Sequence, residues 1–568
     1  MLLRFTHLPY KPLWSDEFAT IVFSLGHSFR TIPLNQFLTL EELLNPLRVS
    51  SADSVRDVIN YLMTESTHPP IYFVLNHWWI HLFSPENGLV GPGVARSLSS
   101  VLGVLSIPAM FGLGWLVSRS FTVSQLAAVL TAVSPFNVYL AQEARHYTLV
   151  ILWVIASLAC LVVTLRQIQQ GNKLPVWLGI TWVLVNTLGI ATHYFFGLAL
   201  VAQAVVIAAF WLFDRMFWKR AQRLGNRDFD WKQLYVVILG TICGCLVWLP
   251  AWQGSQYHEA TSWAYNYYHS NLDWLNPIRY VITGLITVVT LVPVRRPDGS
   301  ILIVLTGLAI CFSLWVGTKA TQGLKIQFQQ PAYDWSIKAL AGITFGSILI
   351  LCLLDYVQGS RLTSGLRYNF IYFPAAILLL AISLAPQWIR SSQKQSNLSS
   401  HPVGCSLSLG LYLRRRLLVI MIIVVATISA LGVCFNFGYQ KIHRPDLMAP
   451  DVKALSQASV VIAMPQHSHS EIRRLIGLAY ELKDAQLSPK FYFDHQPCGD
   501  ETNPSCNAAT ETFRQDLAKL PRPLNLWLID FSGTTNLADQ NCFFDSKLGT
   551  KRPPGFNYQL YSCSGNKS

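Results

Sequence analysis

The hydrophobic residues of this chain are concentrated in long, nearly uninterrupted runs. A helix that crosses the hydrocarbon core of a bilayer needs about 20 predominantly apolar residues. Within lipid, only helices and closed barrels satisfy their backbone polar groups, and the alternating strand pattern of a barrel does not occur here. The pattern therefore predicts an all-α polytopic membrane protein with spans at residues 95–117, 122–140, 147–165, 176–192, 195–213, 234–252, 301–317, 338–356, 370–388 and 417–437.

The last part of the chain has a different pattern. Residues 459–465 (SVVIAMP) and 524–531 (LNLWLIDF) are short apolar runs typical of buried strands, and residues 471–482 between them have the period of an amphipathic helix. We therefore divide the chain into a first loop region (1–94), a transmembrane core (95–437) and a small α/β domain (438–568). The 253–300 loop is the other long segment outside the spans.

Composition and charge support the membrane class. Charged residues make up 13% of the chain, about half the share in soluble domains. The net charge of +13 does not indicate nucleic-acid binding, because the basic residues crowd two loops between spans, as the positive-inside rule predicts for cytoplasmic loops. These are Arg215, Lys219, Arg220, Arg223, Arg227 and Lys232 in one loop, and Arg390, Lys394, Arg414, Arg415 and Arg416 in the other.

This orientation places the first region, the 253–300 loop and the C-terminal domain outside the cytoplasm. The apolar stretch 278–294 is then expected to lie on or partly in the outer leaflet, since a crossing there would invert the second basic loop. Ten crossings also require an external N-terminus. Met1-Leu2-Leu3 looks like the end of a helix, so we expect a preceding span and about 10–11 in all; a shorter natural protein is the alternative.

Four of the eleven cysteines fall in the C-terminal domain. An even number confined to one region predicts two disulfides and an oxidising, non-cytoplasmic compartment. Four unpaired thiols are the alternative, and spacing does not decide the pairing. The four are Cys498, Cys506, Cys542 and Cys563.

Ionisable and polar residues recur at the outer ends of the spans. Each occurrence alone also suits a turn, a helix start or an interface anchor. Together they gather carboxylates, histidines and arginines on one face of the membrane, where such groups tend to be functional. In chain order they are Asp16-Glu17, His68-Pro69-Pro70, Arg96, residues 142–147 (QEARHY), His193-Tyr194 and Arg367-Tyr368.

In this order the motifs resemble the polyprenyl-phosphate-sugar-dependent membrane glycosyltransferases of the GT-C fold, the superfamily of protein O-mannosyltransferases and lipid A aminoarabinose transferases. The resemblance covers residues 1–390. It implies an enzyme of the plasma (inner) membrane with an extracytoplasmic active site that serves glycolipid or cell-envelope synthesis. The long stretch between Glu17 and His68 and the four-cysteine domain depart from the family pattern.

The resemblance also implies residue roles. Asp16 is the expected base for an inverting displacement, assisted by Glu17. Arg145 and Arg367, with Arg96 third, are expected to bind the donor phosphate, because arginine binds phosphate oxygens bidentately. The remaining substrate-binding candidates are Glu143, His68, His193, Tyr147 and Tyr368.

Several points stay undetermined. A divalent cation at Asp16 and Glu17 is compatible with the motif but not demanded by a monophosphate donor. The donor sugar is unknown, and the acceptor is a lipid, a glycan or a protein. One alternative is a polytopic transporter or lipid-linked sugar flippase. Such a protein is expected to show internal repeats or broken helices, and the sequence shows neither. The other alternative is a membrane scaffold that works through residues 438–568.

Overall fold

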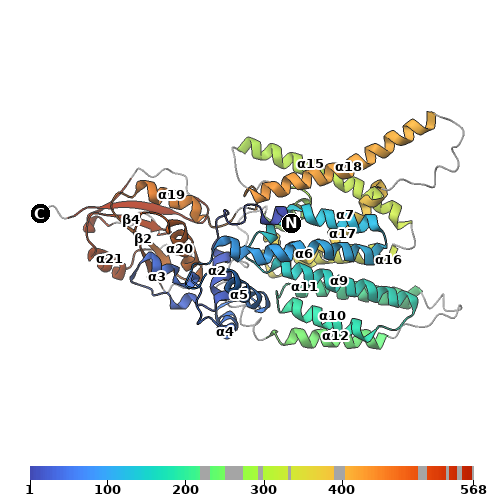
Figure 1. The fold of residues 1–568 in the computed structure, drawn as a ribbon, viewed down its shortest axis with the longest axis horizontal. Helices are drawn as coiled ribbons and strands as arrows, with labels where there is room; N and C mark the ends of the chain where they lie inside the picture. The colour runs from blue at the N-terminus through green and yellow to red at the C-terminus, as the bar shows by residue number, and fades with distance from the viewer. Residues whose placement is uncertain are drawn as a thin grey trace. The chain divides into compact units, whose positions relative to one another are not determined.

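The computed structural model describes residues 1–217, 231–249, 273–291, 299–329, 334–388, 403–439, 441–496, 508–531, 537–545 and 553–565. The chain divides into two compact units. Met1–Leu8 and Arg96–Gln440 form one, here called the helical unit; Pro9–Ala95 and Lys441–Ser568 form the other, the α/β unit (Figure 1). The first loop region and the C-terminal region, separate in the sequence-based division, thus share one unit.

The helical unit confirms the predicted polytopic helical class. Among the described residues, five helices are long and apolar enough to cross a membrane, or six if a bent pair counts as one span. They are α6 (Pro92–Ser118), α9 (Tyr147–Gln170), α15 (Gly299–Phe328), α16 (Asp334–Gln358) and α18 (Val403–Cys434). Shorter apolar helices are α10 (Val176–Ile190), α11 (Phe196–Phe217), α12 (Trp231–Leu246) and α17 (Phe373–Trp388). Every predicted span falls on one of these helices or on the bent pair.

The bent pair corrects the sequence analysis, which predicted one continuous span at 122–140 and no broken helix. Helices α7 (Phe121–Val133) and α8 (Pro135–Ala141) meet at an angle of 57°. Pro135 lacks a backbone N–H and disfavours helical geometry at Ser134. The bend is stabilised by Arg4, whose guanidinium donates to the carbonyls of Thr131 and Ala132 at 3.0 and 3.1 Å. Hydropathy did not reveal it because the apolar run continues through the break.

The apolar stretch expected at the outer leaflet forms a short helix, α14 (Asn276–Ile286), of 11 residues. At 1.5 Å per residue it extends about 16 Å, roughly half the thickness of a bilayer core. It is therefore too short to cross as a helix. Residues 218–230 and 389–402, which hold much of both basic loops, lie outside the described residues, so the orientation stays a prediction.

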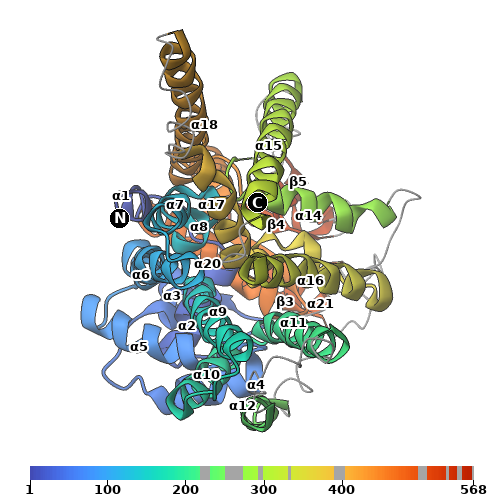
Figure 2. The ribbon, with the colours of Figure 1, turned by 90° about the vertical axis from the view of Figure 1, so that its right-hand side faces the viewer.

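Helix α17 lies at the centre of the helical unit and packs against α7, α15, α16 and α18. A second group of contacts joins α9, α10 and α12. Figure 2 shows α9, α10 and α12 beside one another. Ten of the sixteen residues of α17 are buried, so the neighbouring helices pack around it.

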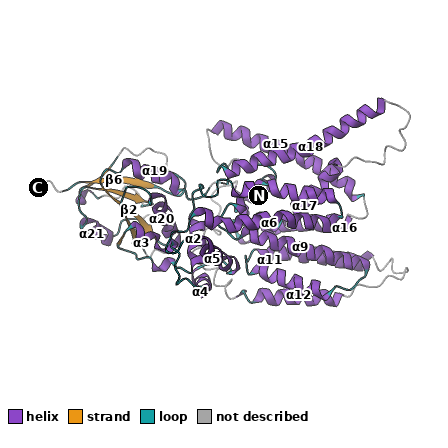
Figure 3. Ribbon diagram, viewed as in Figure 1, coloured by secondary structure: helices purple, strands orange, loops and turns teal. Residues whose placement is uncertain are grey.

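The α/β unit contains a six-stranded sheet in the order β1-β3-β2-β4-β6-β5 (Figure 3). Its central strand β2 (Ser459–Gln466) runs parallel to β3 (Lys490–His495) and β4 (Leu524–Ile529). Antiparallel β6 (Tyr558–Cys563) and β5 (Cys542–Phe544) complete one side. Strands β2 and β4 and helix α20 (His469–Leu482) confirm the predicted α/β pattern.

The opposite edge of this sheet comes from the first loop region. Strand β1 (Phe37–Leu38) pairs antiparallel with β3. The same region supplies α2 (Ser15–Leu25), α3 (Leu40–Leu44), α4 (Val55–Glu65) and α5 (Ile71–Phe83). Helices α2, α3 and α19 (Pro445–Leu455) pack against α20. A sequence pattern does not predict this assembly because its parts lie at opposite ends of the chain.

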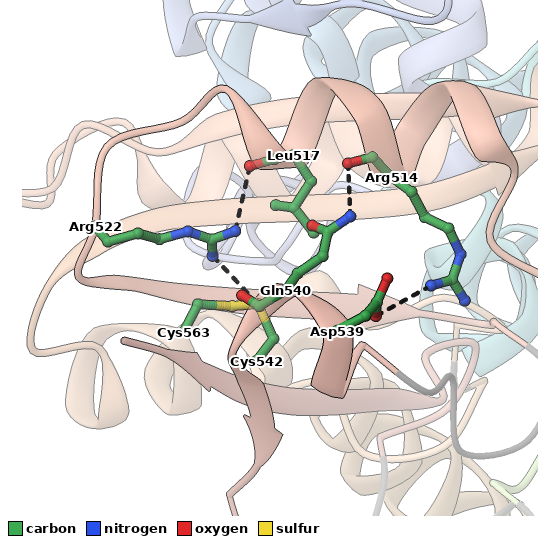
Figure 4. Close-up of a disulfide and its surroundings, with 7 residues drawn as sticks. All are labelled: Arg514, Leu517, Arg522, Asp539, Gln540, Cys542 and Cys563. Carbon is green, nitrogen blue, oxygen red and sulfur yellow. Dashed lines mark hydrogen bonds and ion pairs between the residues drawn. A yellow bond between two sulfur atoms is a disulfide. The ribbon is translucent and has the colours of Figure 1, made fainter. Parts of the chain in front are cut away.

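A disulfide joins Cys542 and Cys563, which are register partners on β5 and β6. Figure 4 shows its surroundings: Arg522, just before β4, donates to the carbonyl of Leu517 and to Cys542 Sγ. One of the two expected disulfides is thereby confirmed. Cys498 and Cys506 lie outside the described residues.

Candidate functional site

The first part of the candidate site is the link between α8 and α9, residues 142–147. Its ionisable side chains are almost completely buried: Glu143 is 1% exposed, Arg145 3% and His146 0%. Ser99 on α6 donates from Oγ to the Arg145 carbonyl at 2.8 Å, and the Arg145 N–H donates to the Glu143 carbonyl at 2.8 Å. The segment is thus a tightly held turn that keeps charged groups inside the helical unit.

Two other links converge on this turn. The ring of His193, between α10 and α11, lies 4.6 Å from the ring of His146 and 5.7 Å from that of Tyr147. Tyr368, in the 3-10 segment before α17, has its ring 6.1 Å from His193. The structure therefore brings together Tyr147, His193 and Tyr368, which the sequence analysis selected separately. We call these residues, with Glu143, Arg145, His146 and Arg367, the arginine–aromatic cluster.

Both arginines of the cluster lie against aromatic rings. The Arg145 Cζ atom is 5.8 Å from the centre of the Tyr147 ring, and the Arg367 Cζ atom is 5.5 Å from that of Tyr368. Such cation–π contacts help to orient a guanidinium. The Tyr139 hydroxyl on α8 hydrogen-bonds with Glu143 and is within electrostatic range of Arg367, so Glu143 and Arg367 share a neighbourhood.

His193 has a defined hydrogen-bonding role. Its Nδ1 accepts the backbone N–H of Phe195 at 3.0 Å. In the neutral imidazole the proton is therefore on Nε2, which makes Nε2 a donor. A neutral donor suits a contact to a sugar hydroxyl or a phosphate oxygen.

Arg96, the third arginine candidate, has a structural contact. It is fully buried on α6 and donates from Nη1 to the Leu8 carbonyl at 2.9 Å. This bond ties the first residues of the chain to α6. Arg96 lies one turn before Ser99, which contacts the turn of the arginine–aromatic cluster.

The Asp-Glu motif lies in the α/β unit, in the first turn of α2. Carboxylates are favoured there by the helix dipole. Glu17 is fully buried, whereas the side chain of Asp16 is 21% exposed, so of the two, Asp16 has access to solvent. His68 belongs to the same unit and stacks on Phe73, with the ring centres 6.1 Å apart.

The sequence analysis missed the residues that surround Asp16. Arg473 on α20 places Nη1 3.7 Å from Asp16 Oδ1, and His443 Nδ1 lies 2.7 Å from Ser15 Oγ. Burial, followed by the charge of Arg474, lowers the pKa of His443 to about 3. The only sequence signal was the amphipathic pattern of residues 471–482, which does not show which side chains face α2.

The candidates thus fall into two groups. Asp16, Glu17 and His68 lie in the α/β unit, while Arg96, Glu143, Arg145, Tyr147, His193, Arg367 and Tyr368 lie in the helical unit. Within the described parts of the chain, no group of three or more His, Cys, Asp or Glu side chains is arranged to hold a metal ion.

Comparisons with known proteins give matches among solved structures alone. No family model matches the sequence, and no curated protein matches it. The fold is similar to that of ArnT from Cupriavidus metallidurans bound to undecaprenyl phosphate, with 14% identity and a TM-score of 0.48 over 99% of this chain and 96% of that one. It is also similar to the archaeal oligosaccharyltransferase AglB from Archaeoglobus fulgidus in complex with an inhibitory peptide and a dolichol-phosphate, with 12% identity and a TM-score of 0.46 over 96% and 70% of the two chains.

Proposed function

We propose that this protein is an integral membrane glycosyltransferase that transfers a sugar from a polyprenyl-phosphate donor to a lipid, glycan or protein acceptor on the extracytoplasmic face. The observation that carries the proposal is the arginine–aromatic cluster. Burying charged groups inside an apolar helical unit is unfavourable unless they are paired or functional. Three separate links between helices supply this cluster, in keeping with a binding site for an anionic group.

In this proposal Arg145 and Arg367 bind the phosphate of the donor. Guanidinium groups keep their charge and match phosphate oxygens with paired N–H groups. Tyr147 and Tyr368 orient the two guanidiniums, and Glu143 supports the cluster through Tyr139. His193 donates a hydrogen bond from Nε2 to an oxygen of the polyprenyl-phosphate sugar. We assign Arg96 to holding residues 1–8 against α6.

Asp16 is the proposed base. The acceptor oxygen forms a bond to the sugar C1 as the bond from C1 to the phosphate oxygen breaks. The acceptor proton passes to the Asp16 carboxylate, and the electron pair of the broken bond leaves with the polyprenyl phosphate. Attack opposite the leaving group inverts the anomeric centre. Glu17 supports Asp16, and His68 is a further candidate for a substrate contact.

The test is donor turnover by the purified full-length protein in lipid nanodiscs. The donors are a panel of polyprenyl-phosphate hexoses and pentoses, each supplied together with lipid, glycan and peptide acceptors that carry hydroxyl groups, and release of free polyprenyl phosphate is measured. We expect release with at least one donor, and loss of release in Asp16→Asn and Arg145→Ala. Wild-type protein that releases no lipid phosphate from any donor contradicts the proposal. A parallel reaction with EDTA tests whether transfer needs a divalent cation. Activity that survives EDTA indicates that the arginines alone bind the phosphate, and activity that is lost indicates a cation.

A transporter or lipid-linked sugar flippase is the second candidate, and the break between α7 and α8 favours it, since broken helices line substrate sites in many transporters. Proteoliposomes loaded with a labelled lipid-linked sugar separate the two functions. A flippase moves the label across the bilayer with the sugar still attached to its lipid. The proposed enzyme separates sugar from lipid phosphate.

A further inference from the structure

The Asp-Glu motif is held in place by a helix from the other end of the chain. Along the interface between α2 and α20, the rings of Phe18 and Tyr480 are 5.9 Å apart. A side-chain carbon at Gly477 would lie 3.1 Å from the Phe18 ring, so the glycine permits the close approach of the two helices. The position of Asp16 is therefore determined by the α/β unit.

Several ionisable groups face the start of α2. Arg473 and Arg474 come from α20, and His443 comes from the segment before α19. Arg474 is bound to the Asp530 carboxylate and the Gly555 carbonyl. His443 is kept neutral at physiological pH by a pKa lowered to about 3, through burial and the neighbouring arginines. Glu17, on α2 itself, is fully buried.

Arg473 is the cation directed toward Asp16. Its Nη1 lies 3.7 Å from Asp16 Oδ1, and both side chains are about one-fifth exposed, at 19% and 21%. Its Nε donates to the His469 carbonyl at 3.2 Å, which ties the guanidinium to its own helix. At 3.7 Å this pair of atoms is in ion-pair range but beyond the usual hydrogen-bond length, so this contact acts on Asp16 through the charge of the guanidinium.

We infer that Arg473 is a positioning residue for the proposed glycosyl transfer, holding Asp16 ionised and oriented toward the acceptor. The inference rests on the proposed function. A carboxylate accepts a proton only when ionised, and a nearby cation favours its ionised form. The start of α2 favours a carboxylate, but the adjacent Glu17 is a second acid, and a like charge beside Asp16 disfavours its ionisation. The α/β unit would then be part of the catalytic machinery.

The test compares Arg473→Ala and Arg473→Lys in full-length protein in nanodiscs, by kcat, donor KM and the pH dependence of kcat. We expect Arg473→Ala to lower kcat about 10–100-fold and to move the acid limb of the profile up by about one pH unit. Arg473→Lys should keep the wild-type acid limb because the charge remains. Unchanged kcat and profile, or a rise in KM alone, would overturn the inference.

A matched control lies on α21 (Glu511–Ala518) of the same unit. Arg514 there pairs with Asp539 at 3.6 Å, as Figure 4 shows, and Arg514→Ala should leave kcat and its pH profile unchanged. Thermal midpoints of all variants identify any loss of folding. If Arg473→Ala does not fold, the comparison of Arg473→Lys with wild type is the test. If wild type releases no lipid phosphate, the proposed function fails. If wild type is active and Arg473→Ala behaves like Arg514→Ala, only the inference fails.

Discussion

The hydroxyl of Ser15 and Nδ1 of His443 lie 2.7 Å apart although 428 positions separate the two residues in the chain. This hydrogen bond joins the start of α2 to the segment that leads into α19. His443 is largely buried there, and Arg473 and Arg474 add positive charge beside it. The imidazole is therefore a neutral structural partner of Ser15 at physiological pH, and protonating it is unfavourable.

This arrangement predicts how stability depends on pH. In the unfolded chain His443 has an ordinary pKa of 6.5, and in the folded protein its pKa is lowered to about 3. Between these values the unfolded state binds more protons, so stability is highest above pH 6.5 and falls as the pH drops toward 3. We expect His443 to account for a loss of about 2 kcal/mol at pH 5 relative to pH 7.5.

Thermal unfolding of wild type and His443→Gln at pH 5 and 7.5 measures this effect. The variant lacks the titrating group, so its midpoint should change less between the two pH values, even if its stability at pH 7.5 is lower. His495→Gln is a useful control, since His495 is an exposed residue at the end of β3. Equal pH dependence of wild type and His443→Gln would contradict the prediction.

The sequence was a good guide where structure depends on local pattern. Strand β2 and helix α20 match the predicted segments closely, because the period of apolar residues is a local signal. The break at Ser134 was missed because hydropathy reports how apolar a segment is and does not report a change in the direction of the helix axis. Its stabilising partner, Arg4, lies 127 positions before Thr131, beyond the reach of any local pattern.

The candidate site divides in the same way. Arg145 and His193 were selectable because charged or polar residues stand out between apolar spans. Arg473 was not, because an arginine on an amphipathic helix normally faces solvent. Its proximity to Asp16 follows from the packing of α2 on α20, which depends on Gly477 and Phe18 from opposite ends of the chain.

The disulfide between Cys542 and Cys563 provides a second prediction. The linked residues are 21 positions apart, and closing a loop of this length stabilises a fold by about 3 kcal/mol. Cys542→Ser combined with Cys563→Ser should lower the thermal midpoint of the α/β unit by roughly 10 °C. Cys311→Ser, which removes a free thiol on α15, should not change it. Equal midpoints for the double variant and wild type would show that the bond does not stabilise the purified protein.

Arg145 is the sharpest test of the donor site. Arg145→Ala removes the charge and should lower kcat/KM about 10²–10³-fold, as expected for a lost electrostatic contact in the transition state. Arg145→Lys keeps the charge but loses the paired N–H groups, so its activity should be intermediate. Arg166→Lys is the control: Arg166 lies near the other end of α9 and donates to the Val117 carbonyl at 3.0 Å. Comparable activity in all three variants would remove Arg145 from the site.

The two adjacent carboxylates of α2 should respond differently to neutral substitutions. Asp16 is partly exposed and is the proposed base, so Asp16→Asn should lower kcat about 10²–10⁴-fold with little change in thermal midpoint. Glu17 is fully buried, and removing its charge alters interactions inside the α/β unit, so Glu17→Gln should shift the thermal midpoint as well as kcat. Lipid-phosphate release and thermal unfolding, measured on the same preparations, distinguish the two residues. An active Asp16→Asn enzyme would end its assignment as the base, and a larger loss of kcat in Glu17→Gln than in Asp16→Asn would transfer that role to Glu17.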